Sequence, residues 1–361
     1  MNDREAMARA LELARLGWGR VAPNPLVGAV LLRNGEVLAE GHHAEFGGPH
    51  AEAVALAQCS DPRGATCVLN LEPCAHVGKT PPCADALIAA GVRRVVYATP
   101  DPDGLAAGGG DRLRAAGVEV EVGVRREEAA ALNAAFLWDR TRPSRPFVAV
   151  KAATSADGFL ADAEGHSRWI SGPEAREWVH WLRAGFGALA VGRSTAVEDD
   201  PELTVRGPVT PRVAPKRVVI ARSAELPPTL RLVRTARDVP TVVFVPPADR
   251  PPLARALEGT AVAVRAAEDL TAVFAALRDD GVESVLVEGG GRLIASLLEA
   301  ELVDRVYWIQ APFWLGSGRP AFGPRRGLPL ADAPRWAVTE RRALGADTLL
   351  VLDRELCLPA L

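Results

Sequence analysis

The sequence lacks long hydrophobic runs. Nowhere among its 361 residues is there an uncharged apolar stretch of about 18 residues, the length that a membrane-spanning helix requires. The first residues also lack the uninterrupted apolar core of an export signal, because Asp3, Arg4, Glu5 and Arg9 lie among them. We therefore expect no membrane partner and a cytoplasmic location.

Cysteine is scarce and odd in number. A disulfide framework uses a dense and even set of cysteines, whereas this chain has five, at positions 59, 67, 74, 83 and 357. Cys59 and Cys67 fall in a helical and a strand pattern, where cysteine usually packs as a small apolar group. Cys74 and Cys83 remain as candidates for a metal site.

An excess of basic residues is also absent. The net charge is −3 and the isoelectric point is about 6.1, so the chain has no overall positive field for binding a polyanion. We expect no nucleic-acid partner. The composition, with 48% hydrophobic and 24% charged residues, is typical of a globular protein, and the length suggests two domains.

Apolar runs alternate with helical patterns along the chain, which predicts an α/β fold. In the first part, strands are predicted at 27–32, 66–71, 92–98 and 118–122, and helices at 4–16, 51–58, 84–90, 111–116 and 127–138. The segment 140–146 holds two prolines and three arginines and is typical of a linker. We therefore expect one domain at 1–143 and a second at 144–361.

The second part repeats this alternation. Strands are predicted at 147–152, 188–191, 217–220, 241–245, 261–264, 284–287 and 305–310, and helices at 173–184, 268–280 and 292–299. Pro173 suits the first turn of its helix, and Ser171 is the predicted cap.

The first half contains a set of metal-binding residue types. His50 and Glu52 stand two residues apart where a helix begins, and Cys74 and Cys83 follow a predicted strand. One imidazole and two thiolates leave the fourth tetrahedral position of zinc open for water, as in catalytic sites. With Glu52 moving protons, this set predicts hydrolytic deamination of a heterocycle. The alternative is a closed structural site with His76 as fourth ligand.

The spacing of the two cysteines and an upstream motif provide a family resemblance. The segment P-C-x8-C, from Pro73 to Cys83, and Pro23-Asn24-Pro25-x-Val27-Gly28 resemble the bifunctional deaminase/reductase of riboflavin biosynthesis. The resemblance implies a cytidine-deaminase-like three-layer α/β/α domain whose substrate is a diaminopyrimidinone ribosyl 5′-phosphate. It further implies that the pocket is lined by Asn24, His42, His76 and Lys79.

The residues at positions 24, 43 and 103 allow interpretations other than substrate binding. From its residue type and position alone, Asn24 could be only a turn residue, and we expect His43 to be solvated. Members of this family often have DPNP where this chain has Asp101-Pro102-Asp103-Gly104. An acidic Asp103 would repel a phosphorylated ligand unless it points away or finds a cation.

The second half has a glycine-rich turn after a predicted strand. Glu288 is followed by Gly289, Gly290, Gly291 and Arg292 and then by a helical pattern, so a diphosphate could bind at the helix N-terminus. The motif is not the Rossmann fingerprint, because Ile294 stands where a third glycine is required. The alternative is a tight turn.

The same family resemblance extends over residues 4 to 350, and it implies a dihydrofolate-reductase-like second domain that uses NADPH. By this resemblance the substrate would be held by Ser167, Arg183, Leu203, Arg206 and Glu288. The cofactor would be held by Ala153, Trp169, Thr195, Asp199, Gly290, Gly291 and Arg292. Arg222 stands where the family often has serine, and we assign it hypothetically to the 2′-phosphate of NADPH. Lys151 either faces this cleft or is a solvated strand-end lysine.

Together these features predict an enzyme that deaminates the pyrimidinone at zinc and then reduces the ribosyl side chain to ribityl with NADPH. We also expect a homo-oligomer. The alternatives are an enzyme with only one active half, a nucleic-acid or nucleoside deaminase with a non-catalytic accessory domain, and a regulatory protein that binds without turnover.

Overall fold

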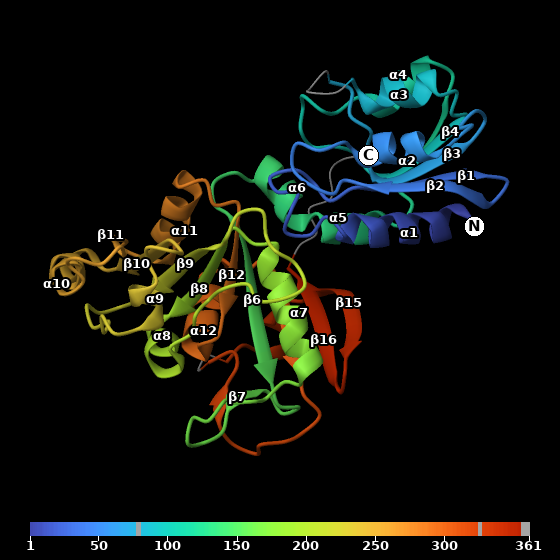
Figure 1. The fold of residues 1–361 in the computed structure, drawn as a ribbon. Coiled ribbons are helices and arrows are strands. Elements are labelled where there is room, and N and C mark those ends of the chain that lie inside the picture. Colours follow the sequence, from blue (N-terminus) through green and yellow to red (C-terminus); the bar gives the residue numbers. More distant parts are fainter. Residues whose placement is uncertain (77–80, 324–326, 355–361) are drawn as a thin grey trace. The chain divides into compact units, whose positions relative to one another are not determined.

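The computed structural model describes residues 1–76, 81–323 and 327–354, and it contains two compact units. The first unit comprises Met1–Arg142, and the second runs from Pro143 to the end of the described chain. Figure 1 shows each unit as a sheet with helices packed on it. In the described residues, no helix is long and apolar enough to cross a membrane.

The first unit has a five-stranded sheet in the order β2-β1-β3-β4-β5. Its strands are β1 (Gly28–Arg33), β2 (Glu36–His42), β3 (Thr66–Leu71), β4 (Arg94–Thr99) and β5 (Glu119–Val122). Strand β1 is antiparallel to β2 and β3, whereas β3, β4 and β5 are parallel to one another. The sequence analysis did not predict β2, whose first two residues are exposed.

Helices lie on both faces of this sheet in the described residues of the unit. They are α1 (Asp3–Arg15), α2 (Ala51–Gln58), α3 (Cys83–Ala89), α4 (Gly109–Ala115), α5 (Arg126–Leu132) and α6 (Ala134–Thr141). Leu31 of β1 packs with residues of α2, α3 and α4, and its neighbour Val30 packs with residues of α1 and α5. Because successive strand residues face opposite sides, the helices form layers above and below the sheet. The predicted three-layer fold is confirmed, but the predicted helix at 127–138 is two helices, α5 and α6.

The second unit has a nine-stranded sheet in the order β11-β10-β9-β8-β12-β6-β13-β16-β15. Its strands are β6 (Phe147–Thr154), β8 (Ala188–Gly192), β9 (Lys216–Ile220), β10 (Thr241–Val245), β11 (Ala263–Ala266), β12 (Ser284–Glu288), β13 (Arg305–Gln310), β15 (Ala337–Leu344) and β16 (Asp347–Asp353). All neighbours are parallel except the pairs made by β16. A small separate sheet joins β7 (Phe159–Ala161) to β14 (Arg319–Pro320).

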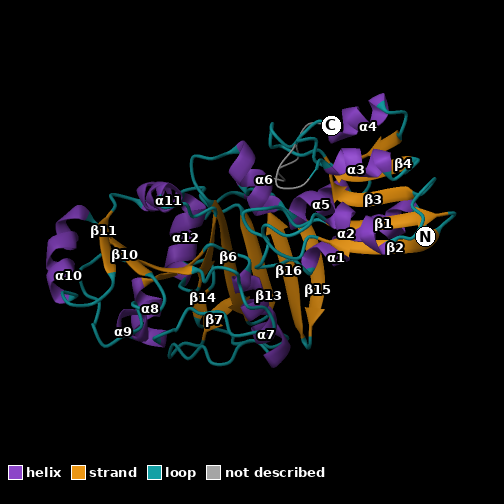
Figure 2. Cartoon of the chain, turned by 45° about the horizontal axis from the view of Figure 1, so that its top comes forward, coloured by secondary structure: helices purple, strands orange, loops and turns teal. Residues whose placement is uncertain are grey.

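The helices of this unit connect the parallel strands (Figure 2). They are α7 (Pro173–Ala184), α8 (Arg193–Asp199), α9 (Arg231–Arg234), α10 (Arg250–Ala256), α11 (Leu270–Asp279) and α12 (Gly291–Glu299), with short 3₁₀ turns at Pro247–Asp249 and Leu330–Asp332. Gly172, not Ser171, occupies the cap position of α7 and makes no side-chain cap, so that part of the prediction is wrong. Instead, the Gly172 N–H donates to Asp347 Oδ2 at 2.7 Å.

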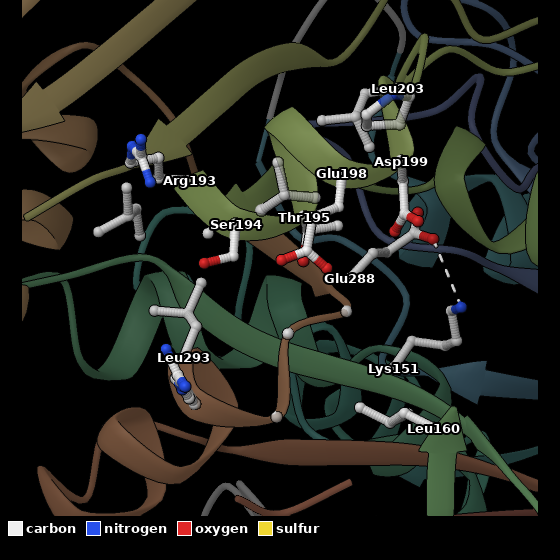
Figure 3. A pocket seen from close by; sticks show the side chains of 18 of the residues that line it. Lys151, Leu160, Arg193, Ser194, Thr195, Glu198, Asp199, Leu203, Glu288 and Leu293 are labelled. Carbon is white, nitrogen blue, oxygen red and sulfur yellow. Dashed lines mark ion pairs between the residues drawn. The ribbon is translucent and has the colours of Figure 1, made fainter. Parts of the chain in front are cut away.

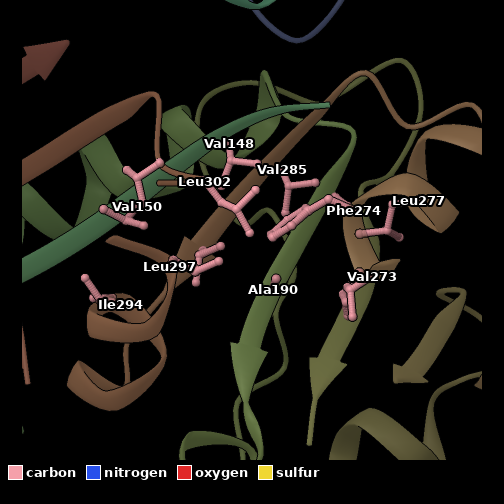
Figure 4. Packing of buried hydrophobic residues seen from close by; sticks show 14 of the residues in the cluster. Val148, Val150, Ala190, Val273, Phe274, Leu277, Val285, Ile294, Leu297 and Leu302 are labelled. Atoms are coloured by element: carbon pink, nitrogen blue, oxygen red, sulfur yellow. The ribbon is translucent and has the colours of Figure 1, made fainter. Parts of the chain in front are cut away.

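The core of the second unit lies between the sheet and helices α11 and α12. Phe274 and Leu277 of α11 and Ile294 of α12 are fully buried against Val148 and Val285 of the central strands (Figure 4). Burying apolar area of this kind contributes roughly 25 cal/mol per Å². The central parallel strands are thereby fixed, and their carboxyl ends become a rigid edge on which a site can be built.

Candidate active sites

In the first unit, His50, Cys74 and Cys83 come together although 33 residues separate the first from the last. His50 stands at the cap position of α2, Cys74 follows β3, and Cys83 is the first residue of α3. His50 Nδ1 lies 3.7 Å from Cys74 Sγ and 3.3 Å from Cys83 Sγ. One ligand atom from each of the three residues lies within 4.8 Å of the others.

These separations fit zinc. With Zn–S near 2.3 Å and Zn–N near 2.0 Å, tetrahedral geometry places nitrogen and sulfur about 3.5 Å apart. The exposed His76 is not part of the group, so the described residues supply three ligands and no fourth. This arrangement is that of an open, catalytic zinc site and disagrees with the closed structural alternative.

The protein already favours a thiolate at this site. Hydrogen bonds from the Cys83 thiol and the His50 imidazole lower the pKa of the Cys74 thiol. The Cys83 backbone N–H also donates to Cys74 Sγ at 3.4 Å. The shared hydrogen bond raises the pKa of the Cys83 thiol, whereas the bond from the Cys83 N–H stabilises the Cys74 thiolate, the form that zinc binds.

Glu52 lies in the first turn of α2, two residues after His50, and is 3% exposed. Burial raises the pKa of its carboxyl above the ordinary value. A buried carboxyl near a metal site that is not one of its ligands can hold and release a proton. Burial and a raised pKa are properties that a proton-transfer group needs, and the role of Glu52 stays a prediction.

Asn24 contacts His43, a residue that the sequence analysis assigned wrongly. His43 was expected to be solvated, but it is 3% exposed, and its Nδ1 lies 2.9 Å from the Pro49 carbonyl oxygen. Because that carbonyl only accepts, Nδ1 carries the hydrogen, and the neutral ring accepts at Nε2 from Asn24 Nδ2 at 3.1 Å. Position 43 precedes the metal ligand by seven residues, but only the fold shows that it meets Asn24.

The remaining predicted pocket residues differ in their surroundings. His42 ends β2 and is half-buried, and burial lowers the pKa of its imidazole. Lys79 lies outside the described residues. Asp103 has found a cation, since its carboxylate lies 3.4 Å from Arg140 Nε. Arg140 also pairs with Asp139, so the two aspartates share one cation.

The second unit contains a cleft of about 2040 Å³ at the carboxyl ends of the parallel strands. Every residue predicted to bind substrate or cofactor in this half lines it: Ser167, Arg183, Leu203, Arg206 and Glu288, together with Ala153, Trp169, Thr195, Asp199, Arg222, Gly290, Gly291 and Arg292. Lys151 lines it as well, so the cleft-facing interpretation of Lys151 is confirmed.

Glu288 is the charged centre of this cleft (Figure 3). It ends β12, and its two carboxylate oxygens accept hydrogen bonds from Arg183 Nε and Nη2 at 2.5 and 3.0 Å. Lys151 Nζ lies 3.6 Å away on neighbouring β6. Burial opposes the charge of Glu288, but these two cations outweigh it and lower the pKa of Glu288 to about 2. Glu288 is therefore an anion at neutral pH.

The glycines after Glu288 allow other segments of the chain to approach this turn closely. Gly290 has a φ of 79° and caps α12. A Cβ on Gly291 would lie 2.3 Å from the Pro320 carbonyl oxygen, and one on Gly290 would lie 3.0 Å from Thr195 Oγ1. The turn therefore brings the N-terminus of a nine-residue helix to the cleft, which is a suitable place for phosphate oxygens.

The arginines that line the cleft fall into two groups. Arg183 donates to Glu288 and, through Nη1, to the Thr204 carbonyl at 3.0 Å, and Arg206 pairs with Glu202. Among the described residues, neither Arg222 nor Arg292 has a carboxylate or carbonyl partner within bonding distance. Their charges are the ones available to an anionic ligand.

Two folds and two sites thus define a zinc-dependent deaminase joined to a reductase. Residues 1–99 match the cytidine and deoxycytidylate deaminase zinc-binding region, and residues 146–350 match the RibD C-terminal domain. The chain belongs to the RibD family of bifunctional riboflavin-biosynthesis enzymes. This finding agrees with the resemblance inferred from the motifs and gives no support to a one-function alternative.

Full-length relatives support this assignment. The riboflavin biosynthesis protein RibD of Escherichia coli (strain K12) is 39% identical, with 98% of this chain and 99% of that protein covered. RibD of Actinobacillus pleuropneumoniae is 38% identical, with 97% and 95% covered. The structure of Acinetobacter baumannii RibD, form 1, has a TM-score of 0.78 at 36% identity, with 97% of this chain and 98% of that chain covered.

A second solved structure carries a more specific description. A Thermotoga maritima protein described as a diaminohydroxyphosphoribosylaminopyrimidine deaminase/5-amino-6-(5-phosphoribosylamino)uracil reductase has a TM-score of 0.77 at 34% identity. The comparison covers 97% of this chain and 98% of that one.

Proposed function

We propose that the first unit hydrolytically deaminates 2,5-diamino-6-ribosylamino-4(3H)-pyrimidinone 5′-phosphate. His50, Cys74 and Cys83 would hold zinc, which when bound supplies a Lewis acid that makes water nucleophilic near neutral pH. Glu52 would accept a proton from the attacking water and pass it to the departing amine, so that ammonia leaves and a carbonyl replaces the C–N bond. Asn24, His42, His76 and Lys79 would bind the substrate.

We further propose that the second unit reduces the ribosyl group of the deaminated product to ribityl. NADPH, when bound, supplies the hydride, so the protein needs to place and polarise the opened sugar or its imine and no protein nucleophile is required. Ser167, Arg183, Leu203, Arg206 and Glu288 would hold this substrate. The anionic Glu288 can accept hydrogen bonds from sugar hydroxyls while Arg183 keeps it in place.

The assignment of the cofactor side rests on the same cleft. Ala153, Trp169, Thr195, Asp199, Gly290, Gly291 and Arg292 would hold NADPH, and Arg222 would bind its 2′-phosphate. Trp169 is 71% exposed, so its ring is accessible for stacking on a flat group. The cytoplasmic location and the homo-oligomer stay predictions.

The observation that carries the proposal is the buried Glu52 beside three zinc-type ligands. Its test is the purified Glu52→Gln protein, with ammonia release and NADPH oxidation followed separately. We expect ammonia release to fall by roughly 10²- to 10⁴-fold because the amide cannot carry the proton. Reduction of the already deaminated compound should keep its wild-type rate, and a parallel loss of both activities would contradict the proposal of two separate sites.

A further inference from the structure

Glu72 is a buried carboxylate near the zinc ligands that the mechanism above leaves without a role. It follows β3, precedes Cys74 by two residues and is 8% exposed. Its Oε2 accepts a hydrogen bond from the Asp101 N–H at 3.1 Å. Its Oε1 accepts from the N–H groups of Gly110 at 2.8 Å and Gly108 at 3.2 Å. One side chain thus binds both ends of the segment 101–110.

The middle of this segment borders the metal site. Ala106 packs with Cys74 and Cys83 in one buried cluster. The Ala75 N–H, next to Cys74, donates to the Ala106 carbonyl at 2.9 Å. At the start of the segment, the Asp101 side chain lies close enough to interact electrostatically with both His50 and Cys74. The segment is therefore a wall of the deaminase site.

Other contacts hold the middle of this wall, since Asp103 pairs with Arg140 and the Ala106 carbonyl accepts from the Ala75 N–H. Within the segment, Asp101 Oδ1 accepts from the Asp103 N–H at 2.9 Å, and the Asp103 carbonyl accepts from the Ala106 N–H at 2.9 Å. These bonds give the segment its own turn but do not attach its ends to the sheet. Among the described residues, Glu72 is the side chain that joins both ends to the segment between β3 and Cys74.

We propose that Glu72 is a positioning residue of the deaminase site, which fixes the 101–110 wall against which the substrate binds. The chemical requirement is a carboxylate, because both oxygens must accept. A glutamine has one acceptor oxygen and an NH₂ group, so in either orientation of the amide one end of the segment loses its acceptor and faces a donor. The proposal rests on the deaminase activity proposed above.

The experiment compares Glu72→Gln with the wild-type holoenzyme on the diaminopyrimidinone phosphate. We expect KM for ammonia release to rise about tenfold while kcat changes less than about threefold, because a displaced wall weakens binding without touching the reacting atoms. Bound zinc per chain and the rate of reduction of the deaminated compound should equal those of wild type. Glu127→Gln, the same chemical change at an exposed position of α5, is the matched control and should leave both constants unchanged.

The outcomes separate the possibilities. Unchanged KM in Glu72→Gln, or a loss of bound zinc with kcat falling at constant KM, would overturn the positioning role. If Glu72→Gln loses both its bound zinc and all ammonia release, so that the first unit fails to fold, Glu72→Asp decides, since it keeps two acceptor oxygens on a shorter arm: a raised KM supports the role and a wild-type KM overturns it. A wild-type enzyme that releases no ammonia from this compound would contradict the proposed substrate instead.

Discussion

At the scale of single residues, the two sites shift the pKa of a buried glutamate in opposite directions. In the deaminase site, burial dominates and raises the pKa of Glu52, which suits a group that must be protonated and deprotonated in each turnover. In the reductase cleft, Arg183 and Lys151 dominate and keep Glu288 ionised. The same type of side chain is thus suited to carry a proton in one environment and is a fixed anion in the other.

The lowered pKa of Glu288 leads to a pH prediction. A glutamate with an ordinary pKa of 4.5 when unfolded and about 2 when folded stabilises the native state fully above pH 4.5, and this contribution disappears as the pH falls towards 2. Glu288→Gln should therefore lower the free energy of unfolding of the second unit by about 3 kcal/mol at pH 7, because two buried cations lose their partner. The deficit relative to wild type should shrink between pH 4.5 and 2.

Hydrogen exchange of β6 and β12 amides in urea measures this stability without interference from the first unit. Glu258→Gln, an exposed glutamate of the same unit, is the control and should follow the wild-type curve at every pH. A deficit that stays constant down to pH 2 would show that the pKa of Glu288 is not lowered by folding.

Arg222 gives a prediction about cofactor choice. Its guanidinium lines the cleft without an anionic partner in the described residues, and a charge-assisted bond to phosphate contributes about 1.5–3 kcal/mol. Arg222→Ala should raise KM for NADPH by roughly 10- to 100-fold and leave KM for NADH unchanged. Steady-state reduction rates with both cofactors measure it, with Arg237→Ala, an exposed arginine outside the cleft, as control. An unchanged ratio of the two constants would remove Arg222 from the 2′-phosphate site.

At the scale of elements, the sequence predicted the fully buried strands and missed several strands that carry charged residues. Strand β12 is buried along its whole length, so its apolar run was recognised within one residue. Strands β2, β15 and β16 were not predicted, and each carries charged residues. Of these, β2 and β15 lie at the edge of a sheet, whereas β16 lies between β13 and β15. An edge strand is stabilised by backbone pairing with one neighbour, and its side chains need not be apolar.

The same distinction applies to the sites. The grouping of His50, Cys74 and Cys83 was predictable because histidine and cysteine indicate metal-binding chemistry by type and spacing. The Asn24–His43 contact and the bonds of Glu72 to Asp101 and Gly110 join segments 19 to 38 residues apart. The residue types asparagine and glutamate do not indicate which partner they bind, so only the fold reveals these contacts.

At the scale of the whole molecule, each site is built from one unit alone. The zinc ligands and Glu52 all lie in Met1–Arg142, and the residues that line the reductase cleft all lie beyond it. Exhaustive chelation should therefore abolish ammonia release and leave NADPH-dependent reduction of the deaminated compound unchanged. Atomic absorption on the treated protein checks that zinc is gone, and added zinc should restore ammonia release. Full ammonia release from metal-free protein would contradict the zinc assignment.

This separation has a genetic consequence. A chain damaged at Glu52 still carries an intact reductase cleft, and a chain damaged at Glu288 still carries an intact zinc centre. Two such defective alleles expressed in one cell would complement each other, since the compound released by one polypeptide is the starting material of the other.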